Sequence, residues 1–138
     1  MALIQKVTCT ATEMIDNRVV NSHVSSVSLF DRSGNCVEFS TYSEFGECLM
    51  IEHFEYDQQN LVRHKVHHLE EDWEEETVSR FEGHLLKEEI NTITPEHYSK
   101  TTYRYDESGR ILEMIQRDED DQIQYRERFQ YKFNKTIR

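Results

Sequence analysis

Three groups of side chains have types and spacing that could do chemistry, and the first is the histidine run at residues 64–68. Zinc sites combine histidines with cysteine or carboxylate ligands. On a β-strand, His64 and His68 share a face but are separated along it, while His67 points to the other face. Because one strand cannot bring all three rings to one ion, we expect partly exposed strand histidines, and neither a metal site nor a cofactor.

Two acidic runs are candidates for contact with a basic protein partner. The longer run consists of Glu70, Glu71, Asp72, Trp73, Glu74, Glu75 and Glu76. An exposed Trp73 would anchor an interface, whereas a buried one would leave the glutamates as a solvated edge that discourages sheet aggregation. The shorter run, Asp118, Glu119, Asp120 and Asp121, is typical of a hairpin loop. It lacks the spaced ligands and the glycine of an EF-hand calcium loop.

The cysteines do not predict an enzyme or a disulfide framework. Cys9, Cys36 and Cys48 form no C-x-x-C pair, their number is odd, and no histidine follows in a recognisable nucleophile order. No phosphate-binding, dinucleotide-binding or G-x-S-x-G motif is present. We therefore expect a non-catalytic protein of the reducing cytoplasm. The first residues show no signal-peptide layout, and no run of 18 apolar residues predicts a membrane span.

Composition narrows the class of partner. The chain has 138 residues and a net charge of −11, with 36% hydrophobic and 31% charged residues. Phosphate backbones and anionic membranes require lysine and arginine, so nucleic acid and membrane partners are disfavoured. The charge favours a basic protein partner, or solubility alone. A single domain over residues 1–138 with a lean, aromatic-rich core is expected.

The elements that must position these groups are indicated by a recurring turn. In Tyr105-Asp106-Glu107-Ser108-Gly109, the Asp can hydrogen-bond the backbone two residues on, and Gly accepts the left-handed conformation of a hairpin turn. All four glycines of the chain occupy this slot: Gly34, Gly46, Gly83 and Gly109. In residues 54–60 we expect Asn60 to take its place. The aromatics before the turns (Phe30, Tyr56, Phe81, Tyr105 and Phe133) are 26, 25, 24 and 28 residues apart.

This period predicts an all-β fold, an antiparallel meander of about ten strands built from β-hairpin repeats and forming a twisted sheet, an open barrel or a sandwich. The expected strands are 3–15, 18–30, 35–42, 47–56, 61–69, 73–81, 85–93, 98–105, 110–117 and 123–133. Propensity alone would allow a helix at residues 70–83, and Pro95 marks a connection. The first and last strands are free edges that could pair in a homodimer.

The repeated pattern, closest at residues 103–113 and looser at 30–38 and 54–62, resembles the YD repeat of the Rhs family. The resemblance implies stacked β-hairpins. In that family such repeats build long β-sheet shells that can enclose a toxin, and they are often described as carbohydrate-associated. Short stand-alone bacterial proteins with similar hairpins also occur, some of them beside toxin systems. It transfers no catalytic residue to this sequence.

Two hypotheses for the function follow. The first is an immunity protein, an inhibitor that neutralises a basic bacterial toxin through the acidic runs. The second is a small carbohydrate- or ligand-binding module that uses an aromatic face of the sheet. The second hypothesis requires an exposed row of rings and a groove.

Overall fold

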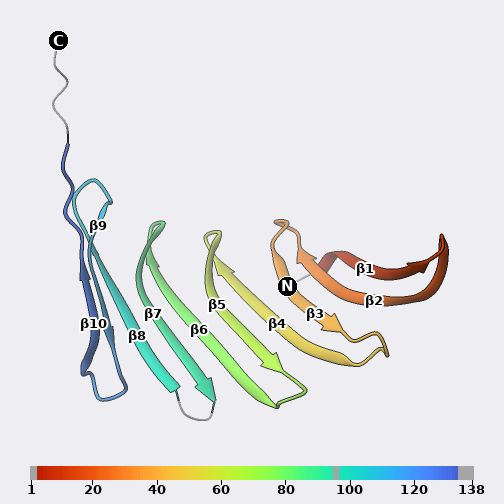
Figure 1. Cartoon of the computed structure of the whole chain (residues 1–138). Helices are drawn as coiled ribbons and strands as arrows, with labels where there is room; N and C mark the ends of the chain where they lie inside the picture. Colours follow the sequence, from red (N-terminus) through yellow and green to blue (C-terminus); the bar gives the residue numbers. More distant parts are fainter. Residues whose placement is uncertain (1–2, 95–96, 134–138) are drawn as a thin grey trace.

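The computed structural model describes residues 3–94 and 97–133 and contains one ten-stranded antiparallel sheet (Figure 1). The strands lie in sequence order, which confirms the all-β meander. Their bounds are β1 (Leu3–Ile15), β2 (Arg18–Asp31), β3 (Cys36–Tyr42), β4 (Cys48–Asp57), β5 (Asn60–His68), β6 (Trp73–Glu82), β7 (Leu85–Thr94), β8 (His97–Tyr105), β9 (Ile111–Arg117) and β10 (Ile123–Arg128). Within the described ranges β1 pairs only with β2, and β10 only with β9, so the sheet is open rather than closed into a barrel.

One boundary of the predicted strands is wrong, and one uncertain strand is confirmed. The last strand ends at Arg128 and not at residue 133, because β9 begins only at Ile111 and offers β10 few further partners; Phe129 donates one more backbone hydrogen bond to Leu112. The strand expected at residues 73–81 is confirmed as β6, and the helix that propensity alone would allow at residues 70–83 does not form. The connection expected at Pro95 lies outside the described residues.

A five-residue turn, here named the capped turn, recurs between the hairpin strands. Its first residue accepts backbone N–H bonds from the third and fifth residues through one side-chain oxygen, as Asp106 does from Ser108 and Arg110 at 2.8 and 2.9 Å. The same two bonds occur in the turns that begin at Asp31, Ser43 and Asp118. The fourth residue has a positive φ, +82° for Gly109, where glycine carries no steric penalty.

The turn between β4 and β5 differs from the prediction. Gln58 and Gln59 have φ of +49° and +67°, so they form a two-residue hairpin turn of the primed kind, and Asn60 is already paired with Asp57 in the ladder. The Asn60 side chain instead donates to the Gly83 carbonyl of the next hairpin turn at 2.7 Å.

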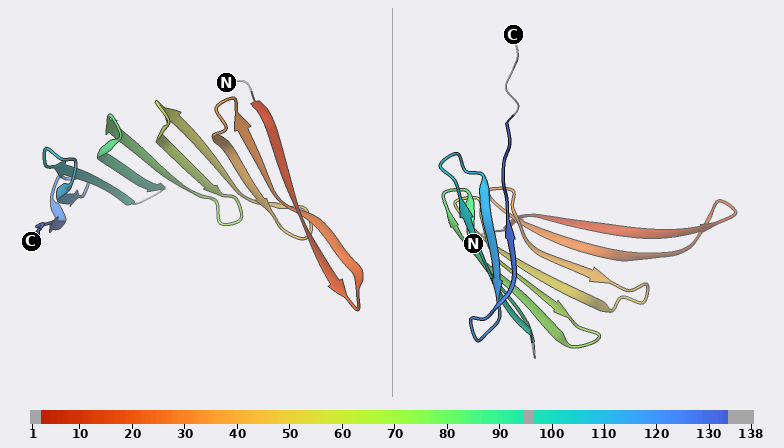
Figure 2. Two further views of the ribbon diagram at one scale, coloured as in Figure 1. Left: turned by 90° about the horizontal axis from the view of Figure 1, so that it is seen from above. Right: turned by 60° about the vertical axis from the view of Figure 1, so that its left-hand side comes forward.

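The sheet is a single layer, as the additional views make plain (Figure 2). Among the described residues Val66, 8% exposed, is the one buried hydrophobic side chain, and no large side chain is fully buried. The accessible surface is 10408 Å², whereas a folded monomer of 16.6 kDa is expected to expose about 7,600 Å². Both faces of the sheet are therefore open.

The two faces differ in chemistry, because directly opposed residues of an antiparallel ladder share a face. One face, named the charged face, carries cross-strand ion pairs such as Lys100–Glu88 at 2.9 Å and Arg128–Glu113 at 3.0 Å. The other, named the aromatic face, carries rings on most strands: Phe39, Phe54, His64, His68, Trp73, Tyr103 and Tyr125.

Candidate protein-binding edge

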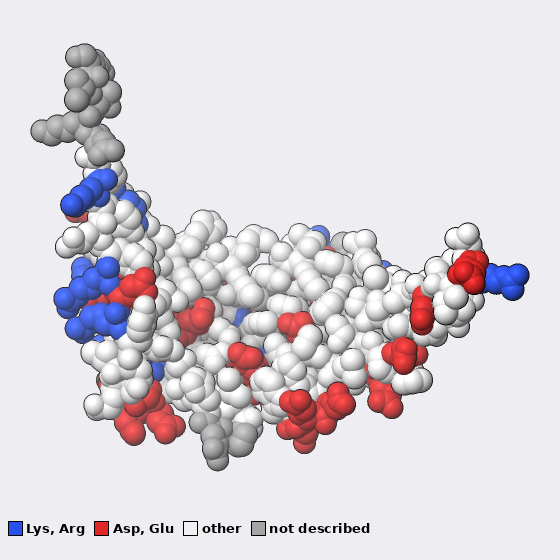
Figure 3. Space-filling view, in the orientation of Figure 1, with Lys and Arg blue, Asp and Glu red and all other residues white. Residues whose placement is uncertain are grey.

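In a meander the loops that follow odd-numbered strands all emerge at the same end of the strands, and so they form a row along one border of the sheet. Three of these loops, residues 43–47, 69–72 and 118–122, define what we call the acidic edge. They hold nine carboxylates and no lysine or arginine: Glu44, Glu47, Glu70, Glu71, Asp72, Asp118, Glu119, Asp120 and Asp121. The acidic atoms are visible along the lower side of the sheet (Figure 3).

Both predicted acidic runs thus reach the same edge, although they are 42 residues apart between Glu76 and Asp118. The β5–β6 and β9–β10 loops are separated by four strand spacings, or about 19 Å at the usual distance between neighbouring strands. The β3–β4 loop extends the edge to about 29 Å by the same spacing. That span suits the face of a small protein better than a small-molecule ligand.

The long run divides where β6 begins. Glu70, Glu71 and Asp72 are exposed in the loop, and the following glutamates alternate between the faces. Glu74 and Glu76 lie on the charged face, paired with Lys65 at 3.6 Å and with Arg63 at 3.7 Å. Those carboxylates are already neutralised by neighbours.

Glu75 and Trp73 point to the aromatic face. The Asn91 side-chain amide donates to Glu75 at 3.1 Å. The Trp73 ring is half-buried, stacks on His68 with 3.9 Å between the ring centroids, and donates its Nε1–H to Glu71 at 2.9 Å. Trp73 is therefore neither an extended anchor nor a core residue, but a ring held beside the acidic loop.

The short run has mixed roles. Asp118 is the cap of a capped turn, and its second oxygen accepts from the Gln124 amide at 2.9 Å. Asp121 takes the position that glycine has in the other capped turns, with φ of +63°, and lies 3.6 Å from Arg117. Glu119 and Asp120 are exposed at the tip, so they remain the candidate contact residues of this loop.

Phe45 is a candidate contact residue that the acidic runs do not include. It is 83% exposed, more than any other large hydrophobic side chain that the structure describes, and lies between Glu44 and Glu47 in a capped turn. An aromatic residue placed between the cap Ser43 and the turn glycine Gly46 was the available signal, since that position is at the tip of a hairpin.

The carboxylates of the charged face and those of the acidic edge differ in their pairing. On the charged face the Lys100 ammonium, hydrogen-bonded to Glu88, lowers the pKa of that carboxyl. Arg128, joined by Arg126 and Arg104, lowers the pKa of Glu113. By contrast Glu44, Glu47, Glu70, Glu119 and Asp120 have no hydrogen bond or ion pair from their side chains to the described part of the chain.

The histidines of residues 64–68 separate as their strand alternation predicts. His64 stacks on Phe54 and lies 2.8 Å from Glu52 on the aromatic face, whereas His67 contacts Asp72 at 3.2 Å from the charged face. Within residues 3–94 and 97–133 no three metal-ligating side chains converge.

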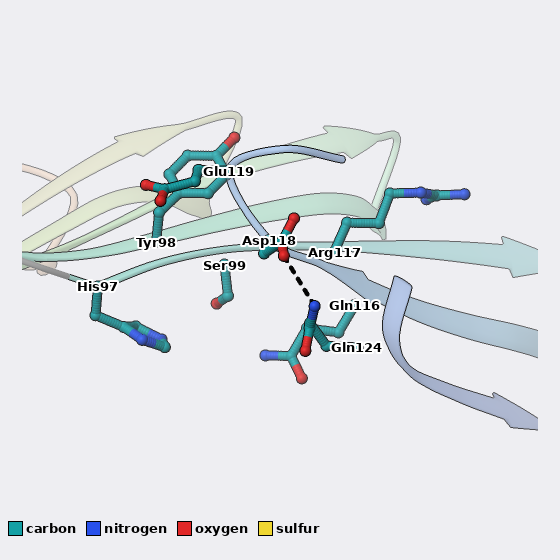
Figure 4. A pocket seen from close by; sticks show the side chains of 8 residues that line it. All are labelled: His97, Tyr98, Ser99, Gln116, Arg117, Asp118, Glu119 and Gln124. Atoms are coloured by element: carbon teal, nitrogen blue, oxygen red, sulfur yellow. Dashed lines mark hydrogen bonds between the residues drawn. The ribbon is translucent and has the colours of Figure 1, made fainter. Parts of the chain in front are cut away.

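A polar hollow lies where β8, β9 and β10 meet the acidic edge (Figure 4). His97, Ser99, Gln116 and Gln124 line one side of it, and Tyr98, Arg117 and Glu119 extend to the other side of the sheet. Tyr125, 48% exposed, is opposed to Gln116 in the ladder and therefore lies on the same face as the amides. The hollow offers hydrogen-bonding groups beside an accessible ring.

The part of the chain that the structure describes contains no helix, and so none that could cross a membrane. No family model matches this sequence, and no curated protein matches it.

Proposed function

We propose that this chain is a non-catalytic protein-binding module, most concretely an immunity protein that neutralises a basic bacterial toxin in the cytoplasm. The observation that carries the proposal is the acidic edge, where three loops present carboxylates without a single basic residue. Such an edge speeds association with a basic partner and occupies the cationic groups of its active site.

The chemistry of the faces supports the same reading. Carboxylates on the charged face are paired across strands, so their attraction for an outside partner is largely cancelled. At the acidic edge, Phe45 and Trp73 place apolar surface beside unpaired carboxylates. Aromatic side chains next to complementary charge are the usual composition of a tight protein interface.

The test is capture followed by growth rescue. The tagged chain is incubated with host lysate at low salt, bound proteins are eluted with a salt gradient, and each is expressed alone and together with the chain. We expect a basic protein that stops growth alone, is tolerated in the presence of the chain, and elutes steeply with salt. Captured proteins that are harmless when expressed alone would refute the inhibitor proposal.

A matched pair of variants locates the binding surface. Neutralising the edge (Glu70→Gln, Glu119→Gln, Asp120→Asn) should weaken capture and rescue at least about tenfold, because attraction to a cationic partner is lost. The control removes equal charge from carboxylates that lie away from the acidic edge and have no ion pair with the described residues (Asp57→Asn, Glu89→Gln, Glu107→Gln), and it should leave both unchanged. Equal effects of the two variants would assign the binding to net charge rather than to the edge.

The second candidate is a carbohydrate-binding module, favoured by the hollow beside Tyr125. Amide, hydroxyl and imidazole groups suit sugar hydroxyls, and an exposed ring suits a sugar face. Calorimetric titration with an oligosaccharide panel would support it if binding were lost in Tyr125→Ala and retained in Tyr103→Ala, whose ring lies elsewhere on the aromatic face.

A further inference from the structure

The outer side of β1 is a long unpaired edge. β1 has 13 residues, and its described side chains from Gln5 onward are exposed except for that of Ala11. An extended strand of this kind presents a row of free N–H and C=O groups that can pair with another strand.

The two edges of the sheet are protected to different degrees. β10, at the opposite end, has only six residues, three of which are charged: Arg126, Glu127 and Arg128. β1 contains one cation and one anion, Lys6 and Glu13, and neither proline nor glycine. Its local charge is balanced although the chain as a whole is at −11, so two copies of β1 can approach without strong repulsion.

The backbone direction along β1 is defined by one contact. Ser25 lies in a bulge of β2 and has no partner in the β1–β2 ladder. Its hydroxyl donates a hydrogen bond to the Cys9 carbonyl at 3.1 Å. The backbone groups of Cys9 therefore point inward to β2. Because N–H and C=O directions alternate along a strand, those of Thr8 and Thr10 point outward to the free edge.

Cys9 is also the midpoint of β1, with six residues on each side between Leu3 and Ile15. An antiparallel pair of identical strands uses its full length only when the two-fold axis passes through the midpoint. In that register Cys9 meets its own copy at a non-hydrogen-bonded position, where Cα atoms are about 4.5 Å apart.

We infer that two copies of this chain pair antiparallel along β1, with the two-fold axis at Cys9, to form one continuous sheet of twenty strands, twice the ten of one chain. Thr8 then pairs with Thr10 of the second copy and Lys6 with Thr12, each pair exchanging backbone hydrogen bonds. Val7 meets Ala11 and Gln5 meets Glu13, so no like charges are opposed. The acidic edges lie at strand ends and stay free, and this inference is independent of the proposed function.

The test uses the thiol at the axis as a probe of register. A variant that retains only Cys9 (Cys36→Ser, Cys48→Ser) is oxidised with the thiol oxidant diamide, which accepts the two electrons and two protons released when the two Cys9 thiols join, and is run on a non-reducing gel. We expect a disulfide-linked dimer, because the Cα separation permits a disulfide. The matched control moves the exposed thiol by one residue (Cys9→Ser, Thr8→Cys) and should lose the cross-link, since position 8 faces position 10 of the second copy.

A second measurement does not depend on cysteine chemistry. Light scattering should give twice the 16.6 kDa mass for the wild-type chain and the single mass for Thr8→Pro. Proline at an outward-pointing position removes only the intermolecular donor, so the circular dichroism should remain that of a β-sheet. A wild-type monomer, or equal cross-linking from positions 8 and 9, would overturn the inference.

Discussion

At the scale of single residues, the hydroxyl of Tyr105 joins the end of β8 to the start of β7 by donating to the Leu86 carbonyl at 2.5 Å. Tyr56 donates to Cys36 at 3.0 Å and Tyr131 to Ile111 at 2.7 Å in the same way, over 20 residues in each case. Phe81, at the equivalent position near the end of β6, has no hydroxyl and cannot make this bond. The repeat thus includes a hydrogen bond from a tyrosine hydroxyl to a backbone carbonyl of the preceding strand, which we name the tyrosine clasp. The positions of the glycines do not predict it.

Tyr105→Phe should lower the free energy of unfolding by about 1 kcal/mol, because it removes one partly buried hydrogen bond and little volume. Tyr103→Phe is the matched control, since its ring lies on the same strand and the same face but its hydroxyl has no bond to the described residues. Urea unfolding of both variants measures the difference. Equal losses would show that the clasp contributes nothing.

The sequence predicts a turn correctly where the turn conformation requires a particular type of residue. Glycine with positive φ and a cap such as Asp106 are recognisable in the sequence, and the structure has them. Gln58 and Gln59 gave no such signal, because glutamine has no preference for positive φ. Their conformation is imposed by the pairing of β4 with β5 on either side.

At the scale of elements, the strands are joined by the backbone ladder and by cross-strand ion pairs, with little buried core. Lys100 on β8 bonds Glu88 on β7, and three arginines of β8 and β10 surround Glu113 on β9. The pairing of opposite residues follows from the strand register, which the sequence predicted only to within a few residues. For that reason the partners of each glutamate could not be named in advance.

These pairs make stability depend on pH. The pKa values of Glu88 and Glu113 are lowered by hydrogen bonds from Lys100 and Arg128, and that of Asp106 by the backbone N–H of Arg110. A lowered folded-state pKa stabilises the fold above the ordinary value, near 4.5 for glutamate, and that contribution is lost as pH falls through the folded-state value. The melting temperature should therefore fall from pH 5 to about pH 3.

Glu88→Gln and Glu113→Gln together should reduce this acid slope, whereas Glu70→Gln, which alters an unpaired carboxylate, should not. Differential scanning calorimetry over the same pH range measures it. An acid slope unchanged in the double variant would show that the cross-strand pairs do not stabilise the sheet.

At the scale of the whole molecule, the open single layer is the feature that the sequence left undecided among sheet, barrel and sandwich. The reason is visible in the strands. Val66 is buried, yet the next side chains on its face, His64 and His68, are polar rings that pack against neighbours without an opposing layer. Such faces are half apolar, so the alternation of side chains in the sequence does not distinguish a face covered by a second layer from a face exposed to solvent.

The placement of the acidic edge belongs to the same scale. Each run was recognised as acidic, and the meander order then put both at one edge. Their division into paired and unpaired carboxylates depended on where β6 begins and on the capped turn at Asp118. Those positions are fixed by neighbouring strands and not by the runs themselves.

The most direct test of this account is the solvent exposure of both faces, since partner binding and edge pairing assume an open sheet. A soluble nitroxide added to methyl-labelled protein should broaden the methyl NMR signals of exposed side chains. We expect the signals of Val78, Ile90 and Ile115 on the charged face to broaden as strongly as those of Ile93 and Met114 on the aromatic face. The signals of the buried Val66 should broaden least. Protection of one entire face from the nitroxide would contradict the single-layer sheet.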